Sequence, residues 1–270
     1  MMKIDMIKYE ERAGGEEYAE FYMDGIQHYY LNSLRRSALT EVPVLAIHDV
    51  IIHQNTSSLF DDVLSNRLGL IPLTAAPSEI DVLGECSKAG LNYETSVKKC
   101  SARLKLQKRG EKEGVTVVYA KDIEAVDKDS VQPVNGDIPV AKLGKDQEID
   151  VEMIAKVGRG KDHSKWNPTE TNGYKPLPGF YVKESCTGCG ECVEACPKEI
   201  LKMKGGRPFL TEIGRYECDL GQICTRVCPE DALMLAPAEE AFIYKVSTVG
   251  QHSLDNLLAA SLDGLSRKAV

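Results

Sequence analysis

The spacing Cys186-x2-Cys189-x2-Cys192-x3-Cys196-Pro197 is the part of this 270-residue sequence with the clearest chemistry. An iron–sulfur cluster needs several thiolates that converge on a small volume, and this spacing is that of bacterial ferredoxins. Gly188 and Gly190 favour the tight turns that bring the thiolates together. A structural zinc site is the alternative, but zinc sites usually pair two separate CxxC elements. The run therefore predicts an iron–sulfur cluster.

The cysteine run repeats after 32 positions. The shift places its first, third and fourth cysteines on Cys218, Cys224 and Cys228, and Pro229 follows as Pro197 does in the first copy. Gly221 stands where the second cysteine would be. The repeat resembles a duplicated ferredoxin, in which each half consists of a loop and a short helix.

The two cysteine sets predict two clusters of different completeness. In two-cluster ferredoxins the fourth cysteine of a run ligates the other cluster. A complete [4Fe–4S] cluster is therefore expected on four thiolates, those of Cys186, Cys189, Cys192 and Cys228. The second cluster has only Cys196, Cys218 and Cys224, because Gly221 leaves a gap. Three thiolates suit a [3Fe–4S] cluster or a labile [4Fe–4S] cluster with a fourth ligand other than cysteine. Asp219 is near but stands at the wrong offset for that ligand. An empty second site, with its cysteines free or in a disulfide, stays the alternative.

Two further cysteines, Cys86 and Cys100, lie outside the repeat. Cys100 has the pattern of an inward-facing strand residue and Cys86 that of a loop residue. We expect both to be buried, inert thiols, with a disulfide or a metal pair as the alternative.

Other catalytic signatures are missing from the sequence. It contains no GxGxxG and no GxxxxGK[ST] motif, and no Ser/His/Asp or Cys/His arrangement stands out. The five histidines are scattered, and we expect surface or packing roles for them. The chain is therefore expected to have no catalytic residues of its own.

Amphipathic helices are predicted near both ends of the chain. After Asp24-Gly25, a helical face carries Ile26, Tyr29, Tyr30, Leu34 and Ala38, and the helix should stop before Pro43. A second helix should begin after the N-cap Ser253 and bury a leucine stripe formed by Leu254, Leu257, Leu258, Leu262 and Leu265. Core packing explains both helices, and the second could also form half of a subunit interface.

The middle of the chain changes to the period-two pattern of strands. Residues 100–107 and 115–119 are predicted to form a hairpin, and residues 149–153 and 241–249 to form further strands. The polar segment 121–137 is expected to be loop rather than core. Pro168, Pro176, Pro178 and Gly179 mark a boundary before the cysteines.

Composition limits the classes of function. The formal net charge is −8, which argues against broad binding to nucleic acid, so no direct DNA contact is expected. No apolar run approaches the roughly 20 residues of a membrane helix, and the N-terminus lacks the apolar stretch of a secretory signal. These features predict a cytoplasmic protein without a membrane partner.

Several short segments, taken in order, resemble the D subunit of archaeal RNA polymerase. They are Asn32-Ser33-Leu34-Arg35-Arg36, Glu41-Val42-Pro43-Val44-Leu45-Ala46-Ile47, Asn66-Arg67-Leu68-Gly69-Leu70-Ile71-Pro72-Leu73 and His163-Ser164-Lys165-Trp166-Asn167-Pro168. The D subunit is the counterpart of the third-largest subunit of eukaryotic polymerase II and of the N-terminal domain of the bacterial alpha subunit. Some D subunits carry an inserted ferredoxin-like domain where this chain has its cysteines.

The resemblance implies an α+β fold with three parts. Residues 1–45 and 237–270 would form an alpha-subunit-like dimerisation domain, and residues 46–181 a mostly β second domain. Residues 182–236 would form an inserted, duplicated ferredoxin-like domain, called the cysteine module below.

The resemblance also implies partners and a function. The chain would form a heterodimer with the small L subunit, onto which subunits N and P and the large catalytic subunits assemble. It would be a non-catalytic assembly subunit in transcription, and its clusters would be structural, with an oxygen-sensitive regulatory role as a second hypothesis. The interface candidates are Leu34, Arg35, Arg36, Arg67, Leu254, Leu257, Leu258 and Leu262, the arginines being assigned to the large subunits. Salt bridges are the alternative role of the arginines, and an electron-transfer subunit of an oxidoreductase is the alternative function.

Overall fold

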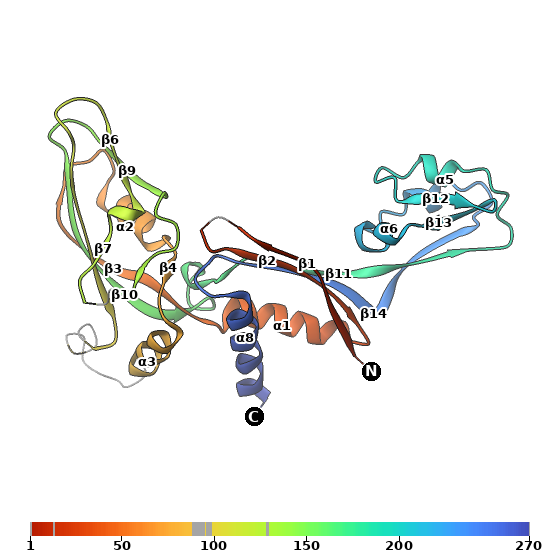
Figure 1. Ribbon diagram of the computed structural model, residues 1–270, viewed down its shortest axis with the longest axis horizontal. Helices are drawn as coiled ribbons and strands as arrows, with labels where there is room; N and C mark the ends of the chain where they lie inside the picture. The colour runs from red at the N-terminus through yellow and green to blue at the C-terminus, as the bar shows by residue number, and fades with distance from the viewer. Residues whose placement is uncertain (1, 13, 88–94, 96–98, 128–129, 270) are drawn as a thin grey trace. The chain divides into compact units, whose positions relative to one another are not determined.

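The computed structural model describes residues 2–12, 14–87, 95, 99–127 and 130–269, and its helices and strands confirm the α+β class (Figure 1). The chain forms two compact units. Unit 1 comprises Met1–Tyr9, Ala19–Asn32 and Gly173–Lys245, and unit 2 comprises Glu10–Tyr18, Ser33–Asn172 and Val246–Val270. This division is coarser than the three expected domains, which stay a prediction.

Unit 2 is built around a four-stranded antiparallel sheet with the order β3-β10-β5-β7. The strands are β3 (Pro43–Asn55), β10 (Glu148–Arg159), β5 (Ala102–Arg109) and β7 (Glu124–Ala125). In β10 the buried Ile149, Val151 and Met153 alternate with Asp150 and Glu152, as predicted for residues 149–153. The apolar face of the sheet is covered by helix α2 (Asp61–Gly69), which buries Leu64 and Leu68 in the same core.

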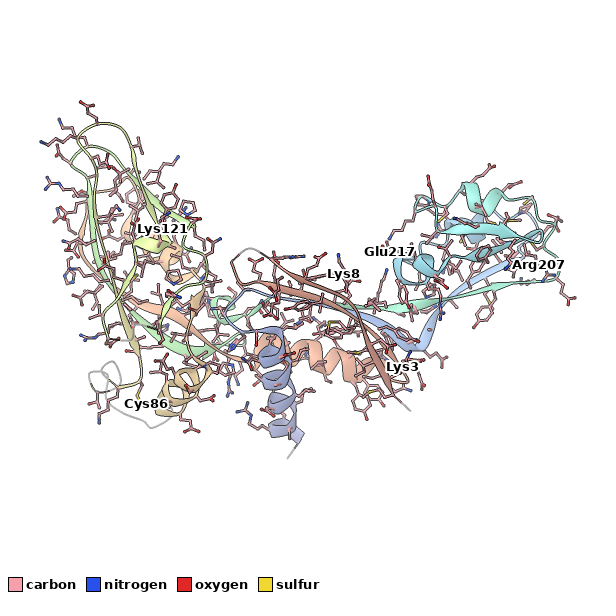
Figure 2. All side chains as sticks on the ribbon, viewed as in Figure 1. Lys3, Lys8, Cys86, Lys121, Arg207 and Glu217 are labelled. Atoms are coloured by element: carbon pink, nitrogen blue, oxygen red, sulfur yellow. A yellow bond between two sulfur atoms is a disulfide. The ribbon has the colours of Figure 1, made fainter. Side chains whose placement is uncertain are left out.

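Shorter elements complete unit 2. Two small sheets pair β4 (Leu73–Thr74) with β8 (Gln132–Pro133), and β6 (Thr116–Tyr119) with β9 (Pro139–Leu143). The single-turn helices are η1 (Ala120–Asp122) and η2 (Ser164–Trp166). On the surface beside η1, Lys121, labelled in Figure 2, forms an exposed ion pair with Asp137.

Two expectations for this region are wrong. Segments 100–107 and 115–119 do form strands β5 and β6, but they do not pair as a hairpin, because β5 pairs with β10 and β6 with β9. The longer ladder with β10 lets Leu104 and Leu106 share a core with Val151. Segment 121–137 is largely irregular, yet Ile123 and Val131 are buried in that core.

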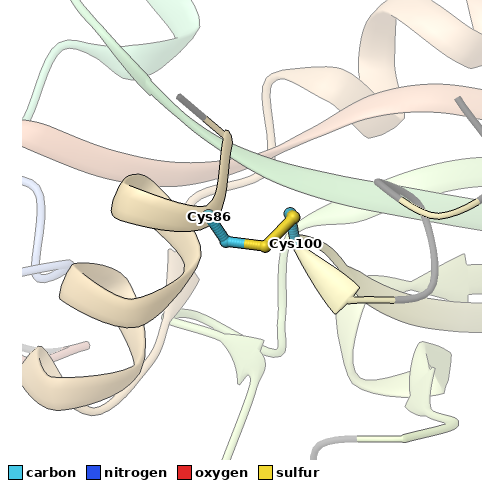
Figure 3. The surroundings of a disulfide bond; sticks show 2 residues. All are labelled: Cys86 and Cys100. Atoms are coloured by element: carbon cyan, nitrogen blue, oxygen red, sulfur yellow. A yellow bond between two sulfur atoms is a disulfide. The ribbon is translucent and has the colours of Figure 1, made fainter. Parts of the chain in front are cut away.

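Cys86 and Cys100 form a disulfide, so the expectation of two free thiols is wrong and the alternative holds (Figure 3). Cys86 lies in helix α3 (Pro77–Ser87) rather than in a loop, and Cys100 is buried just before β5. Their Cα atoms are 5.2 Å apart. Spacing alone could not reveal the pair, because the approach of α3 to β5 is a tertiary contact.

A second four-stranded sheet has the order β1-β2-β14-β11. Its strands are β1 (Lys3–Glu11), β2 (Glu17–Asp24), β14 (Leu233–Thr248) and β11 (Thr169–Val182). The strand predicted at 241–249 is the second half of β14. Helix α1 (His28–Thr40) ends before Pro43 as predicted, but its expected stripe is partly wrong. Leu31 and Ala38 are buried, whereas Tyr29 and Tyr30 are 51% and 60% exposed.

The cysteine module lies in unit 1 between the end of β11 and the start of β14 (Figure 1). It contains the β12–β13 hairpin (Leu201–Lys204 with Arg207–Leu210) and three short helices, α5 (Glu191–Glu194), α6 (Glu212–Glu217) and α7 (Ile223–Arg226).

Helix α8 (Leu254–Ala269) in unit 2 confirms the predicted C-terminal helix. Ser253 Oγ accepts a hydrogen bond from the backbone N–H of Asn256 at 3.3 Å, which confirms the N-cap. No helix in the described part of the chain is long and apolar enough to cross a bilayer.

Candidate metal centre

The two halves of the cysteine module share one backbone pattern. Helices α5 and α7 start and end 32 residues apart, which is the period of the cysteine repeat. Three residues with positive φ in the first half have partners with positive φ at the same spacing in the second: Gly188 and Leu220, Gly190 and Gln222, Glu199 and Asp231. The second loop thus has the backbone conformation of the first although Leu220 and Gln222 stand where the first has glycines.

Four cysteines line one cavity in the first half. They are Cys186, Cys189, Cys192 and Cys228, the set expected for the complete cluster. Gly188 has φ of 76°, and a Cβ there would lie 2.6 Å from the carbonyl oxygen of Gly206. The β12–β13 turn therefore presses on the loop at a point where only glycine fits.

Three cysteines, Cys196, Cys218 and Cys224, line a second cavity of about 180 Å³. Gly221 lines the same cavity, and a Cβ at this position would meet no atom within 4 Å. The space where a fourth thiolate would stand is therefore open.

Electrostatic coupling is strongest among thiols of the same cavity. Burial raises the pKa of Cys192, and Cys189 and Cys228 raise it further. Burial also raises the pKa of Cys224, with added contributions from Cys196 and Cys218 and a smaller one from Cys192 of the first set. Gathering several thiolates in a buried space is costly unless iron neutralises their charge, so the donor set fits a cluster.

Asp219 lines the second cavity but is bound to two cations. Its carboxylate accepts a hydrogen bond from Lys175 Nζ at 3.1 Å and forms a short ion pair with Lys198. The sequence did not point to either lysine. The two lysines hold Asp219 in the wall of the cavity. This agrees with the prediction that Asp219 stands at the wrong position in the sequence to bind iron.

In the described part of the chain, no three His, Cys, Asp or Glu side chains lie close enough to hold a single metal ion. A cluster spreads its ligand sulfurs over several iron atoms, whereas one zinc ion draws its four ligands to about 2.3 Å. The two kinds of site therefore require different spacings of the cysteines.

The interface candidates near α1 and α2 have different surroundings. Leu34 and Arg35 are half-buried, and the carbonyl oxygen of Arg35 accepts a hydrogen bond from Asn172 Nδ2. Arg36 is exposed. Arg67 is exposed on α2, where its guanidinium donates to the carbonyl oxygen of Pro139 at 2.8 Å.

The candidates on α8 divide between two faces. Leu254 and Leu257 are buried within the chain, together with Ser261 and Gly264. Gly264 allows close packing, because a Cβ there would lie 2.9 Å from Ser37 Oγ of α1. Leu258 and Leu265 are half-buried, and Leu262 is 57% exposed. The predicted stripe is therefore only partly covered by the chain itself.

Fold and site define a class: an α+β chain that carries an inserted iron–sulfur module between the strands of a sheet. Family models agree with this class. The RNA polymerase Rpb3/RpoA insert domain matches residues 50–178, and the 4Fe-4S binding domain matches residues 180–202.

Curated relatives extend the match over nearly the whole chain. The DNA-directed RNA polymerase subunit Rpo3 of Methanothermobacter thermautotrophicus is 35% identical over 92% of this chain and 91% of its own length. The Rpo3 subunit of Methanosphaera stadtmanae is 32% identical over 96% and 95%, and that of Pyrobaculum calidifontis is 31% identical over 93% and 94%. The chain therefore belongs to the Rpo3 family of DNA-directed RNA polymerase subunits. It is a non-catalytic subunit, and the alternative of an oxidoreductase subunit is not supported.

Proposed function

We propose that this chain nucleates assembly of an archaeal RNA polymerase by forming a heterodimer with the small L subunit. Subunits N and P and the large catalytic subunits then join the heterodimer. The chain acts in the cytoplasm and makes no direct contact with DNA, in keeping with its net charge of −8.

The observation that supports this proposal most is the leucine face of α8 that the chain itself does not fully cover. One face of the helix packs on the chain itself through Leu254 and Leu257. The other face presents Leu258, Leu262 and Leu265, which are half-buried or exposed. A helix with a second apolar stripe can complete a bundle with a partner helix, and the L subunit is the partner that we propose.

Arginines on unit 2 are proposed to contact the large subunits. Arg36 and Arg67 are exposed, and Arg35 is half-buried beside Arg36. A guanidinium offers five donors in a planar fork, which suits carboxylates across a subunit interface.

The cysteine module is proposed to bind two clusters. Cys186, Cys189, Cys192 and Cys228 ligate a [4Fe–4S] cluster, and Cys196, Cys218 and Cys224 ligate a [3Fe–4S] or labile [4Fe–4S] cluster. Cluster binding supplies much of the folding energy of the module. Oxygen damage to the incomplete cluster would then loosen the module and weaken assembly.

Co-expression with the L subunit tests the heterodimer. The double variant Leu258→Asp with Leu262→Asp should abolish co-purification of L, because two carboxylates would be buried without partners. Val115→Asp is the matched control, because Val115 is 65% exposed at a different surface. Retention of L by the double variant, with α8 still folded, would refute the proposed interface.

Iron counting and EPR of the anaerobically purified heterodimer test the second cluster. The wild type should hold about seven irons and give a [3Fe–4S] signal after oxidation, or about eight when the labile iron is retained. Gly221→Cys should hold about eight and lose the signal, because the added thiolate enters open space. Gly173→Cys is the control, since a Cβ there also meets nothing within 4 Å. About four irons in every variant would mean that the second site is empty.

A further inference from the structure

Three segments distant in sequence meet at one polar pocket in unit 2. Its volume is about 370 Å³. Strand β3 contributes Ile47 to Val50, the end of α2 contributes Ser65, Asn66, Gly69 and Leu70, and the segment around η2 contributes His163 and Lys165. None of these side chains is a candidate cluster ligand or one of the α8 leucines, and Arg67, proposed above to contact the large subunits, lies on α2 beside the pocket but does not line it.

Lys165 is the central cation of this pocket. Its Nζ donates to the carbonyl oxygen of Ile47 at 2.9 Å, lies 3.2 Å from His48 Nδ1, and sits 4.6 Å from the centre of the Trp166 ring. Its backbone N–H donates to His163 Nδ1, which fixes the start of η2. An ammonium group has three donors, and the described residues offer two acceptors to Lys165.

Asp49 and Lys156 are charged neighbours of Lys165. They form a 2.7 Å ion pair with each other, and both act on the pKa of Lys165. Burial lowers the pKa of Lys165, Lys156 lowers it further, and Asp49 opposes the change. Burial and Lys165 likewise lower the pKa of His48. An anion in the pocket would offset the cost of holding Lys165 charged.

An apolar strip borders the pocket along α2. Phe60, Val63 and Leu70 are 80%, 41% and 52% exposed, and Arg67 is exposed between them. Phe60 and Leu70 cap α2 at its two ends, and the spacing of three, four and three residues places the four side chains along one side of the helix, next to the side that buries Leu64 and Leu68. Leu70 belongs to both the strip and the pocket. A cationic pocket beside exposed apolar side chains has the composition of a protein–protein interface.

We propose that this pocket receives an aspartate or glutamate carboxylate from another polymerase subunit, whose neighbouring apolar residues cover Phe60, Val63 and Leu70. Lys165 pairs with the carboxylate, and Trp166 and Ile47 hold the lysine in place before the partner arrives. A protein partner fits better than a free anion, because the apolar strip offers nothing to a small ion. The inference rests on the proposed function and adds a second docking surface, separate from α8.

Lysine acylation gives a test that needs no variant. The chain is purified with the L subunit, and one half is reconstituted with the remaining polymerase subunits. Both samples are labelled with acetic anhydride, and the modified lysines are quantified by mass spectrometry. Lys165 should react in the heterodimer and be protected at least about tenfold in the assembled enzyme, because pairing and burial block the amine. Lys121, which forms an exposed ion pair, should react equally in both samples.

Charge variants test the carboxylate. Lys165→Met should weaken binding of the remaining subunits at least about tenfold, and Lys165→Glu should weaken it more, because two carboxylates would repel each other. Lys121→Met and Lys121→Glu are the controls. The urea midpoint of each free heterodimer, followed by circular dichroism, shows whether the fold is kept.

The outcomes separate the two proposals. Equal labelling of Lys165 in both samples would overturn the inference. So would wild-type binding of the remaining subunits by Lys165→Met and Lys165→Glu. Binding of L is measured in the same preparations. If L fails to bind even the wild type, the proposed function itself fails, whatever Lys165 does.

Discussion

Unit 2 and the cysteine module are stabilised in different ways. Among the described residues, the core of unit 2 contains 21 buried side chains, all of them aliphatic except Met153. The core of the module contains seven, and three of these are the cysteines Cys192, Cys218 and Cys224. A core of this size leaves little apolar burial to offset the entropy of ordering the chain.

The difference shows where the folding energy of each part comes from. Unit 2 can fold by burying side chains, and its disulfide adds a cross-link between α3 and the start of β5. In the module the cysteines are both part of the core and the candidate ligands. Its stability should therefore depend on iron, while that of unit 2 should not.

Removal of iron should have the largest effect. Cys192→Ser should lose about four irons, because it removes a ligand of the complete site. Hydrogen exchange followed by mass spectrometry should then show lost protection in residues 182–236 and unchanged protection in β5 and β10. If the module kept its protection from hydrogen exchange without iron, its stability would not depend on iron any more than that of unit 2.

A cavity in the core of unit 2 should give the converse result. Leu106→Ala should destabilise unit 2 by about 2–5 kcal/mol, since Leu106 is fully buried. Trp166 is the only tryptophan and lies in unit 2, so its fluorescence during urea unfolding measures this loss. Iron content should not change. Val115→Ala, at a position 65% exposed, should stay within about 0.5 kcal/mol of the wild type.

Reduction of the disulfide should come next. Cys86 and Cys100 are 14 residues apart, and closing a loop of this size is worth about 3 kcal/mol. Dithiothreitol should therefore lower the urea midpoint of unit 2, and Cys100→Ser should lower it similarly and abolish the response to dithiothreitol. Equal midpoints with and without reductant would show that the disulfide does not stabilise unit 2. In a reducing cytoplasm the two cysteines would stay as free thiols.

The cysteine module was the part most readable from sequence. Ligand spacing in a cluster loop is local, so Cys186 to Pro197 and the 32-residue repeat predicted which cysteines gather in each cavity. The positive φ at Leu220 and Gln222 was not predictable, because these residue types rarely adopt it. Their conformation follows from the pseudo-symmetric partner loop, which is a property of the folded module.

For unit 2, the sequence predicted separate strands but not how they pair. Period-two alternation found β5 and β10, but it could not show that they pair with each other across about 40 intervening residues. The same limit hid the disulfide and the pocket around Lys165, since both join segments that are distant in sequence. Tyr29 and Tyr30 show a further limit, because a helical stripe does not say whether the chain itself covers it.

The smallest expected effect is electrostatic and again concerns unit 2. Glu41 is buried, and burial alone would raise its pKa, but a hydrogen bond from Lys268, with Lys161 and Arg159 nearby, lowers it below the ordinary value. A carboxyl group whose pKa is lower in the folded state than in the unfolded state stabilises the folded state. This stabilisation is complete at pH values above the unfolded-state pKa and is lost as the pH falls through the folded-state pKa. Glu41→Gln should cost about 1–2 kcal/mol at pH 7, because the cations are partly exposed, and should remove this acid dependence.

Urea midpoints from Trp166 fluorescence between pH 3 and pH 7 measure that dependence, with the exposed Glu113→Gln as the matched control. The wild type and the control should lose stability toward acid more steeply than Glu41→Gln. Because Lys268 lies in the last turn of α8, the result also bears on how that helix is held. Parallel curves for all three proteins would show that the ion pair does not anchor α8, which would leave that role to its buried face, including Leu254, Leu257 and Ser261.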